Sequence, residues 1–216
     1  MNEHHLSVRR TARFYTLGEP AAAEIWIVCH GYAQLARYFL RSFALLDDGT
    51  RCVVAPEALN RYYYETAPGV HTSDARIAAT WMTREDREHE IGDYIAYLDA
   101  LATRLVSGAA TRIVALGFSQ GAATVSRWAA RGVARIDHVI LWSSPLPPEL
   151  EPSATLLRGA HLTIAIGESD EQIPYGEIER QDERLRRAGM DYSLVRYPGG
   201  HGIDAEALAR IAARLR

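Results

Sequence analysis

The sequence has little cysteine: only Cys29 and Cys52 occur among its 216 residues. Each ends or opens an apolar, strand-like run, so we expect buried free thiols rather than a disulfide framework, which fits a reducing cytoplasm. Neither lies at metal-ligand spacing from histidines, and His4-His5 sits in an N-terminal segment that we expect to be mobile. We therefore expect no metal and no cofactor.

Long apolar runs and an excess of positive charge are also missing. No stretch is apolar over enough residues to span a bilayer, and residues 1–16 lack the apolar core of a signal peptide. The formal net charge of −3 gives no electrostatic reason to expect nucleic acid as a partner. Without repeats, linkers or low-complexity segments, residues 1–216 are expected to form one domain that exists as a monomer or homodimer.

Apolar runs typical of buried strands alternate with helical patterns along the chain. The strand-like runs are residues 24–29, 52–55, 111–117, 138–142, 162–166 and 192–197, after an expected edge strand within 9–17. Helical patterns cover residues 34–46, 83–106, a stretch that ends near 131, 175–188, and the C-terminus from Asp204. The second of these opens with a Thr83/Asp86 capping-box pattern. This alternation predicts an α/β fold, a largely parallel sheet with helices on both faces.

Residues 56–82 interrupt this alternation. They are rich in aromatic residues and show little periodicity. A connection of this length inside a compact domain is usually functional or disordered, and the aromatic content argues against disorder. We expect this segment to influence which substrate the protein accepts.

The stretch Gly117-Phe118-Ser119-Gln120-Gly121 lies between a strand-like run and a helical pattern. Such a G-x-S-x-G pattern is typical of the nucleophile elbow, where a strand turns sharply into a helix. The glycines are needed because the two backbones approach too closely for a Cβ atom, and the serine takes strained backbone angles. This geometry would hold the Ser119 hydroxyl at a helix N-terminus, where the partial positive charge favours an oxyanion.

A pattern this short also arises by chance, so a nucleophilic serine needs a base in a suitable place. In doubly wound sheets, ligand sites lie at the carboxyl ends of the strands. Of the three histidines after Ser119, His138 and His161 open strands, whereas His201 follows a strand end between two glycines. His201 is therefore the expected general base, with a capping or loop role as the alternative.

The same rule selects the acid that would orient the base. Asp170 follows the strand-like run 162–166, whereas Asp137 and Asp191 open strands and Asp204 suits an N-cap of the last helix. A turn residue making an Asx hydrogen bond is the alternative role for Asp170. The order of the three residues along the chain is the one expected of α/β-hydrolases: Ser119, Asp170 and His201.

An oxyanion hole requires two backbone N–H groups. One is expected from Gln120, the residue after the nucleophile. The other is expected from Tyr32, in the loop that follows the strand-like run 24–29. We expect His30 to hold that loop in place through hydrogen bonds.

These motifs resemble the phospholipase/carboxylesterase family of small α/β-hydrolases, which includes bacterial carboxylesterases and acyl-protein thioesterases. The resemblance covers nearly the whole chain and rests on His30-Gly31, residues 117–121, the Asp170 turn ending in Ile173-Pro174, and Gly200-His201. It implies a minimal α/β-hydrolase domain and a metal-independent serine esterase mechanism. The tyrosine-rich residues 61–64 and the segment Gly31-Tyr32-Ala33-Gln34 depart from the family pattern, so the resemblance does not imply the substrate.

The substrate site is expected to be an open groove, because residues 143–161 are too few for a large cap domain. Its walls, beside Tyr32, are expected to be Tyr63, Trp81, Trp142, Leu146 and Ile173, with core packing as the alternative for each. Such aromatic walls suit small to medium acyl or aryl esters. The alternatives are a thioesterase, lysophospholipase or amidase with the same triad, and a non-catalytic ligand-binding relative. A dienelactone-hydrolase type would carry cysteine at the elbow, where serine stands.

Overall fold

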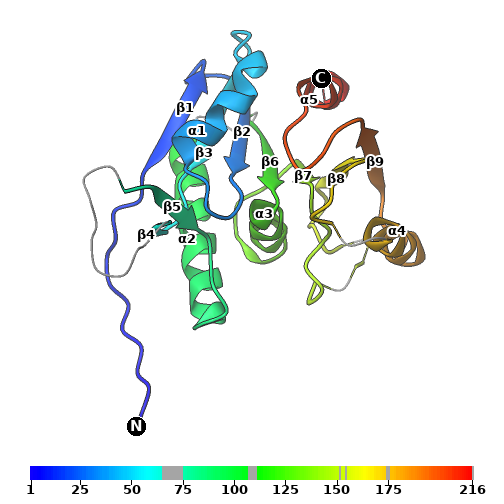
Figure 1. The fold of residues 1–216 in the computed structure, drawn as a ribbon. Helices are drawn as coiled ribbons and strands as arrows, with labels where there is room; N and C mark the ends of the chain where they lie inside the picture. Colours follow the sequence, from blue (N-terminus) through cyan, green and yellow to red (C-terminus); the bar gives the residue numbers. More distant parts are fainter. Residues whose placement is uncertain (65–74, 107–110, 151, 154, 174–175, 216) are drawn as a thin grey trace.

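A seven-stranded sheet crosses the whole molecule in the order β1-β3-β2-β6-β7-β8-β9 (Figure 1). The computed structural model describes residues 1–64, 75–106, 111–150, 152–153, 155–173 and 176–215. The strands are β1 (Phe14–Gly18), β2 (Glu24–Cys29), β3 (Arg51–Pro56), β6 (Arg112–Phe118), β7 (His138–Trp142), β8 (His161–Gly167) and β9 (Tyr192–Tyr197). The edge strand β1 runs antiparallel to β3, and the other neighbours pair in parallel, as the sequence predicts.

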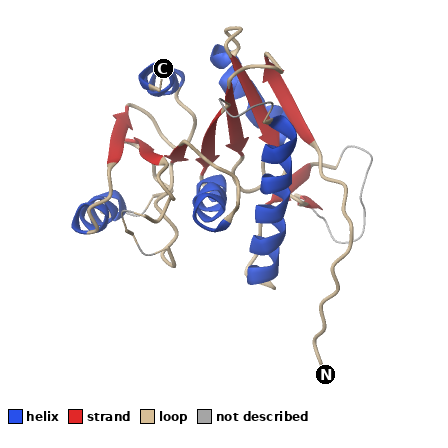
Figure 2. Cartoon of the chain, turned by 180° about the vertical axis from the view of Figure 1, so that it is seen from behind, coloured by secondary structure: helices blue, strands red, loops and turns tan. Residues whose placement is uncertain are grey.

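Helices cover both faces of this sheet (Figure 2). They are α1 (Ala36–Phe39), the 3-10 helix η1 (Leu40–Leu46), α2 (Arg87–Leu105), α3 (Gln120–Arg131), α4 (Glu177–Arg187) and α5 (Ala205–Arg214). Successive side chains of β2 enter different cores: Ile25 and Ile27 pack with residues of α2 and α3, whereas Trp26 and Val28 pack with residues of α1, η1 and α5. Burial on both faces explains why the central strands read as continuous apolar runs.

The carboxyl ends of β6, β7, β8 and β9 lie side by side, because these four strands pair in parallel in that order. The residues expected to react therefore meet at one edge of the sheet. The N-cap of α5 also forms as predicted, since the Asp204 carboxylate accepts a hydrogen bond from the Ala207 amide at 2.7 Å. In the described part of the chain, no helix has the length and apolar character needed to cross a membrane.

Residues 34–46 differ from the single α-helix that we expected. Only one turn of α-helix forms before η1 begins. The buried side chains of η1 are Leu40, Phe43 and Leu46, three residues apart, and residues at this spacing eclipse one another on one face of a 3-10 helix. The tighter helix thus buries three large apolar groups against the sheet.

The Thr83/Asp86 capping box does not form. Helix α2 begins at Arg87, and its N-cap residue Asp86 has φ 49° and ψ 37° without a side-chain cap hydrogen bond. The Asp86 carboxylate instead pairs with His5 and His89. A contact with His89 within α2 and a long-range contact with His5 thus stand where the capping box was expected.

Residues 56–82 contain a small second sheet that the periodicity did not indicate. Strands β4 (Asn60–Tyr63) and β5 (Ile77–Thr80) pair antiparallel, with Tyr62 opposite Ala78. Residues 65–74, between these strands, lie outside the described part of the chain. Figure 1 places this pair of strands beyond the carboxyl ends of β2 and β3, on the same side of the main sheet as the elbow.

Candidate active site

Ser119 stands at a strained turn between β6 and α3. Its backbone angles are φ 52° and ψ −117°, and its amide donates to the carbonyl of Trp142 at 2.9 Å. A Cβ atom on Gly117 would lie 2.1 Å from the Gly121 carbonyl oxygen, and one on Gly121 would lie 2.1 Å from the carbonyl oxygen of Cys29. The steric reason that we gave for both glycines is therefore confirmed, and the Ser119 side chain is only partly buried.

His201 and Asp170 form a hydrogen-bonded pair at the same edge of the sheet. The imidazole Nδ1 lies 3.0 Å from each carboxylate oxygen of Asp170. The Asp170 side chain is 1% exposed and that of His201 is 13% exposed. A protonated Nδ1 donating to this carboxylate leaves Nε2 as the basic nitrogen of the ring. The ring centroid of His201 lies 4.8 Å from that of Phe118, which places the imidazole beside the elbow.

Buried aromatic side chains hold the loop that carries His201. The carbonyl oxygen of Gly202 accepts hydrogen bonds from Trp142 Nε1 and from the Tyr197 hydroxyl, each at 2.8 Å. Burial raises the pKa of Tyr197, so this hydroxyl keeps its proton and donates. The amide of Ser169, one residue before the acid, donates to the Gly199 carbonyl at 2.9 Å. The loops that carry Asp170 and His201 are thus tied to each other and to β7.

The loop after β2 presents its backbone to the same edge. His30 is fully buried, with Nδ1 2.8 Å from the Gly31 carbonyl and Nε2 accepting from the Ala58 amide at 3.1 Å. Burial lowers the pKa of His30 to about 4, so the ring is neutral near pH 7 and holds the loop as predicted. Tyr32 is 58% exposed, and the amide of the next residue, Ala33, donates to the Ala79 carbonyl at 3.0 Å. The roles expected of the Tyr32 and Gln120 amides stay predictions.

The side chain of Gln120 has a structural task that the sequence analysis missed. Its Nε2 donates to the Thr80 hydroxyl and to the Met82 carbonyl, both at 2.9 Å. Its Oε1 accepts from the Trp81 amide at 3.1 Å. These bonds fasten the elbow to the end of β5, 38 to 40 residues earlier in the chain. The sequence shows a glutamine inside the G-x-S-x-G pattern, but it does not indicate which residues that side chain contacts.

Three of the five expected wall residues belong to the hydrophobic core. Trp81, Trp142 and Leu146 are 1%, 0% and 2% exposed. The indole of Trp81 donates to the His30 carbonyl at 2.8 Å, so its surface is already used in packing. These three side chains therefore pack in the core, which was the alternative to a pocket role. Tyr63 and Ile173 retain exposed surface, and their pocket role stays a prediction.

The tyrosine that faces the loop after β2 is Tyr62 rather than Tyr63. Its ring centroid lies 5.9 Å from that of Tyr32, whereas Tyr63 points outward and is 43% exposed. Burial raises the pKa of Tyr62. A run of three tyrosines has no alternation between polar and apolar residues, so the sequence could not show which one faces inward.

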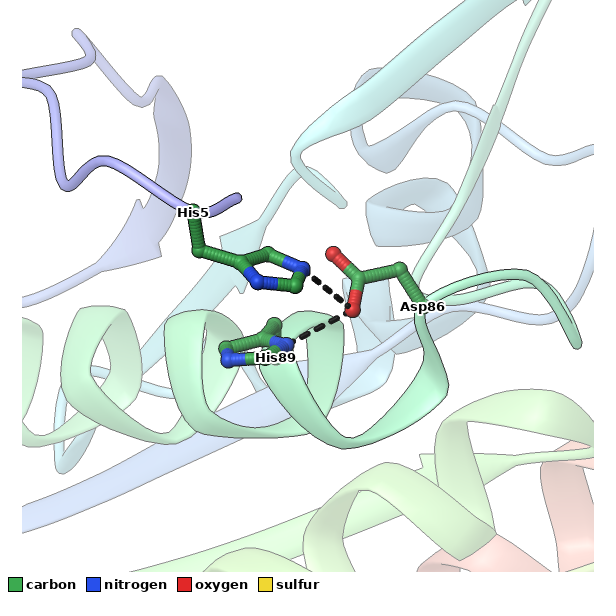
Figure 3. A group of neighbouring side chains, drawn as sticks. All are labelled: His5, Asp86 and His89. Carbon is green, nitrogen blue, oxygen red and sulfur yellow. Dashed lines mark hydrogen bonds and ion pairs between the residues drawn. The ribbon is translucent and has the colours of Figure 1, made fainter. Parts of the chain in front are cut away.

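A second group of polar side chains lies away from the elbow, where the N-terminal segment passes the start of α2 (Figure 3). The rings of His5 and His89 stack with centroids 3.9 Å apart, and both direct a nitrogen at Asp86 Oδ1, at 3.2 and 2.6 Å. The hydrogen bond from His89 lowers the pKa of Asp86. All three are exposed, and the hydrogen bonds account for their arrangement. The expected absence of a metal stays a prediction.

The sheet order, the Ser119 elbow and the placement of Asp170 and His201 at the strand ends define an α/β-hydrolase fold in a single domain. The model of the Dienelactone hydrolase family matches residues 44–209, most of the chain. The chain belongs to this family. Serine at position 119 had set the chain apart from dienelactone hydrolases in our sequence analysis, and this family match shows that the contrast does not hold.

Several solved structures share this fold. Esterase PE8 is 22% identical, with a TM-score of 0.73 over 96% of this chain and 99% of that one. Acyl-protein thioesterase 2 of Zea mays is 16% identical, with a TM-score of 0.70 over 95% and 98% of the two chains. The carboxylesterase of Bacillus cereus is 15% identical, with a TM-score of 0.67 over 94% and 92%. At these identities the likeness shows the fold alone, and no curated protein matches the sequence.

Proposed function

We propose that the protein is a serine hydrolase that cleaves carboxylic esters of small to medium acyl or aryl substrates through an acyl-enzyme on Ser119. The observation that carries this proposal is the His201–Asp170 pair, whose imidazole packs against Phe118, the residue before Ser119. An oriented imidazole packed against the residue before a strained, partly exposed serine supports a role for His201 as the base that activates Ser119.

In the first half of the reaction, Ser119 Oγ attacks the ester carbonyl carbon while His201 Nε2 takes the hydroxyl proton. Asp170 stabilises the imidazolium through Nδ1. The Tyr32 and Gln120 amides bind the oxyanion, and losing one such donor typically raises the barrier by about 2.7–4 kcal/mol. The tetrahedral intermediate collapses, the bond to the alcohol oxygen breaks, and His201 returns its proton to that oxygen.

In the second half, water replaces the alcohol. His201 Nε2 takes a proton from water as the water oxygen attacks the acyl carbon of the Ser119 ester. Collapse of the second tetrahedral intermediate breaks the bond to Ser119 Oγ, which recovers the proton from His201. The products are a carboxylic acid and the free enzyme, and no step requires a further reactant.

The decisive experiment labels the purified protein with a fluorophosphonate probe and locates the adduct by peptide mass spectrometry. We expect the adduct on Ser119 and loss of nitrophenyl acetate hydrolysis to a trace in Ser119→Ala. Ser144→Ala is the matched control, because Ser144 also lies at the carboxyl edge of the sheet but outside the elbow. A folded protein that stays unlabelled, or a Ser119→Ala variant with substantial activity, would refute the proposal and favour a ligand-binding module.

A series of nitrophenyl esters of increasing acyl length, with matched thioesters, refines the substrate class. We expect the highest kcat/KM at short to medium acyl chains, because the rings of Tyr32 and Tyr62, 5.9 Å apart, suit contact with small acyl or aryl groups. A maximum at long acyl chains would contradict this expectation. Faster cleavage of thioesters than of oxygen esters would favour a thioesterase with the same triad.

A further inference from the structure

A cavity of about 890 Å³ opens beside the loop that follows β2. Four arginines from four separate segments contribute to its lining: Arg13, Arg37, Arg61 and Arg76. Among the described residues that line it, none is a carboxylate. The chain as a whole carries a net charge of −3, so this concentration of positive charge is local and does not follow from the composition.

Among the described residues, one carboxylate forms ion pairs with these four arginines. Arg13 and Arg61 approach the same oxygen of Glu57, Oε1, at 2.6 and 3.4 Å. The Glu57 side chain is 1% exposed, so this carboxylate lies beneath the arginines and not in the cavity. Two positive charges share one negative charge, and the pair of arginines keeps a net positive charge toward the cavity.

The other two arginines have aromatic neighbours. The guanidinium of Arg37 lies 4.5 Å from the ring centroid of Tyr38, and that of Arg76 lies 4.5 Å from the centroid of Tyr64. Neither forms an ion pair with a carboxylate of the described residues. A guanidinium packed against a ring is held in orientation while its N–H groups remain able to donate to an anion.

The cavity adjoins the loop after β2, which carries Tyr32, an expected residue of the active site. Ala33, Gln34 and Leu35 line it, and Gln34 Oε1 also accepts a hydrogen bond from the Gly31 amide at 2.8 Å. The loop thus carries the expected oxyanion donor Tyr32 and contributes the next residues to the cavity. The Cα atoms of Tyr32 and Gln34 can lie no more than about 7 Å apart, so a small molecule can span both places.

We propose that this cavity binds an anionic group of the substrate, so that the preferred ester carries a carboxylate or a phosphate. The proposal rests on the proposed esterase function, because it names the substrate class of the same site. Arg37 and Arg76 donate to the anion, and Arg13 and Arg61 supply the surrounding positive potential. Guanidinium groups suit both oxyanions because their N–H groups match carboxylate and phosphate oxygens in pairs.

The kinetic test compares two esters of equal length: the nitrophenyl monoester of glutaric acid and the nitrophenyl ester of its methyl half-ester. We expect kcat/KM to be about tenfold higher for the anionic ester, mainly through KM, because a charge-assisted hydrogen bond is made in the ground state as well. Arg37→Gln and Arg76→Gln should each reduce this preference severalfold. Arg41→Gln is the matched control: its guanidinium lies 5.2 Å from the Tyr38 ring centroid, yet Arg41 does not line the cavity.

A binding test separates this proposal from the esterase function. Calorimetry on the purified protein with glutarate and with inorganic phosphate should show binding that weakens in Arg37→Gln and in added salt. The anion that binds more tightly indicates whether the substrate carries a carboxylate or a phosphate. If neither anion binds and kcat/KM is equal for both esters, the anion proposal is overturned. Labelling of Ser119 in the same protein would still support the esterase function. Anion binding without hydrolysis of either ester instead refutes the esterase function and preserves the cavity as an anion site.

Discussion

The imidazole of His201 and the carboxylate of Asp170 meet at 3.0 Å, although 31 residues separate them along the chain. The contact brings together the loops after β8 and β9, two neighbouring parallel strands whose carboxyl ends coincide. A buried carboxylate that accepts from Nδ1 holds the ring in one tautomer and orientation. This relationship makes His201 the strongest candidate for a base near Ser119.

Removing the charge of Asp170 tests this relationship directly. In Asp170→Asn, an amide replaces the acceptor, so the ring loses its preferred tautomer and the imidazolium loses its stabilising charge. We expect kcat for nitrophenyl acetate to fall by about 10³–10⁴-fold, with little change in KM. Glu168→Gln is the control, because Glu168 is an exposed acid on the same turn. A variant that keeps a tenth of wild-type kcat would show that Asp170 is not the orienting acid.

Truncating Gln120 tests whether its side chain positions the elbow. Gln120→Ala leaves the Trp81 amide without its side-chain acceptor and removes the bonds that Gln120 makes to the Thr80 hydroxyl and the Met82 carbonyl. We expect a loss of about 1–3 kcal/mol in the free energy of unfolding and slower fluorophosphonate labelling of Ser119, because the turn becomes less ordered.

The control for Gln120 is the exposed Gln172→Ala, which should change neither quantity. A change in stability with an unaltered labelling rate would assign Gln120 to packing alone. Measuring kcat and KM separately adds a second criterion, because a positioning effect lowers kcat more than it raises KM.

Two glycine-to-alanine variants should have opposite effects. A Cβ atom on Gly121 would lie 2.1 Å from the Cys29 carbonyl oxygen, so Gly121→Ala must separate α3 from β2, and we expect little folded protein. Gly92 lies exposed within α2 with no atom within 4 Å of its Cβ position. Gly92→Ala should therefore stabilise the protein by about 0.5–1 kcal/mol. Thermal or urea unfolding of both variants measures these differences, and a stable Gly121→Ala would contradict the close packing at the elbow.

Stability should decrease as the pH falls below 6.5, in part because of His138. Burial, followed by the nearby charges of His161 and Arg112, lowers the pKa of His138 to about 4. The unfolded chain binds a proton near pH 6.5 and the folded chain does not, so the stabilising effect of neutral His138 is complete above pH 6.5. It is lost progressively as the pH falls from 6.5 toward 4.

Urea unfolding between pH 7.5 and 4.5 measures this contribution. His138→Gln keeps a polar group that can bond with Thr163, whose hydroxyl lies 2.8 Å from His138 Nε2, and it removes the titrating ring. We expect a shallower decline of stability with falling pH in this variant and an unchanged decline in the exposed His4→Gln. Parallel pH profiles for His138→Gln and wild type would show that His138 does not contribute.

The sequence by itself determined the order of the main-sheet strands and of the helices along the chain, the elbow at Ser119 and the placement of Asp170 and His201 after strand ends, whereas it did not indicate β4 and β5. Each of the predicted features depends on information within a few residues: continuous apolar runs for strands buried on both faces, glycines flanking a serine, and position after a strand end. The same local information misjudged residues 34–46, where three buried side chains follow 3-10 spacing, and the start of α2, where Asp86 contacts His89 and His5.

Only the tertiary structure decided which side chains surround these residues. Gln120 reaches β5, Tyr62 rather than Tyr63 faces Tyr32, and four arginines from separate segments meet at one cavity. Such contacts depend on how distant segments pack together, 40 residues apart in the case of Gln120 and Thr80, and no local pattern in the sequence encodes that packing. The sequence therefore predicts the chemistry proposed for Ser119, whereas the charge and shape that we propose to select its substrate arise from the fold.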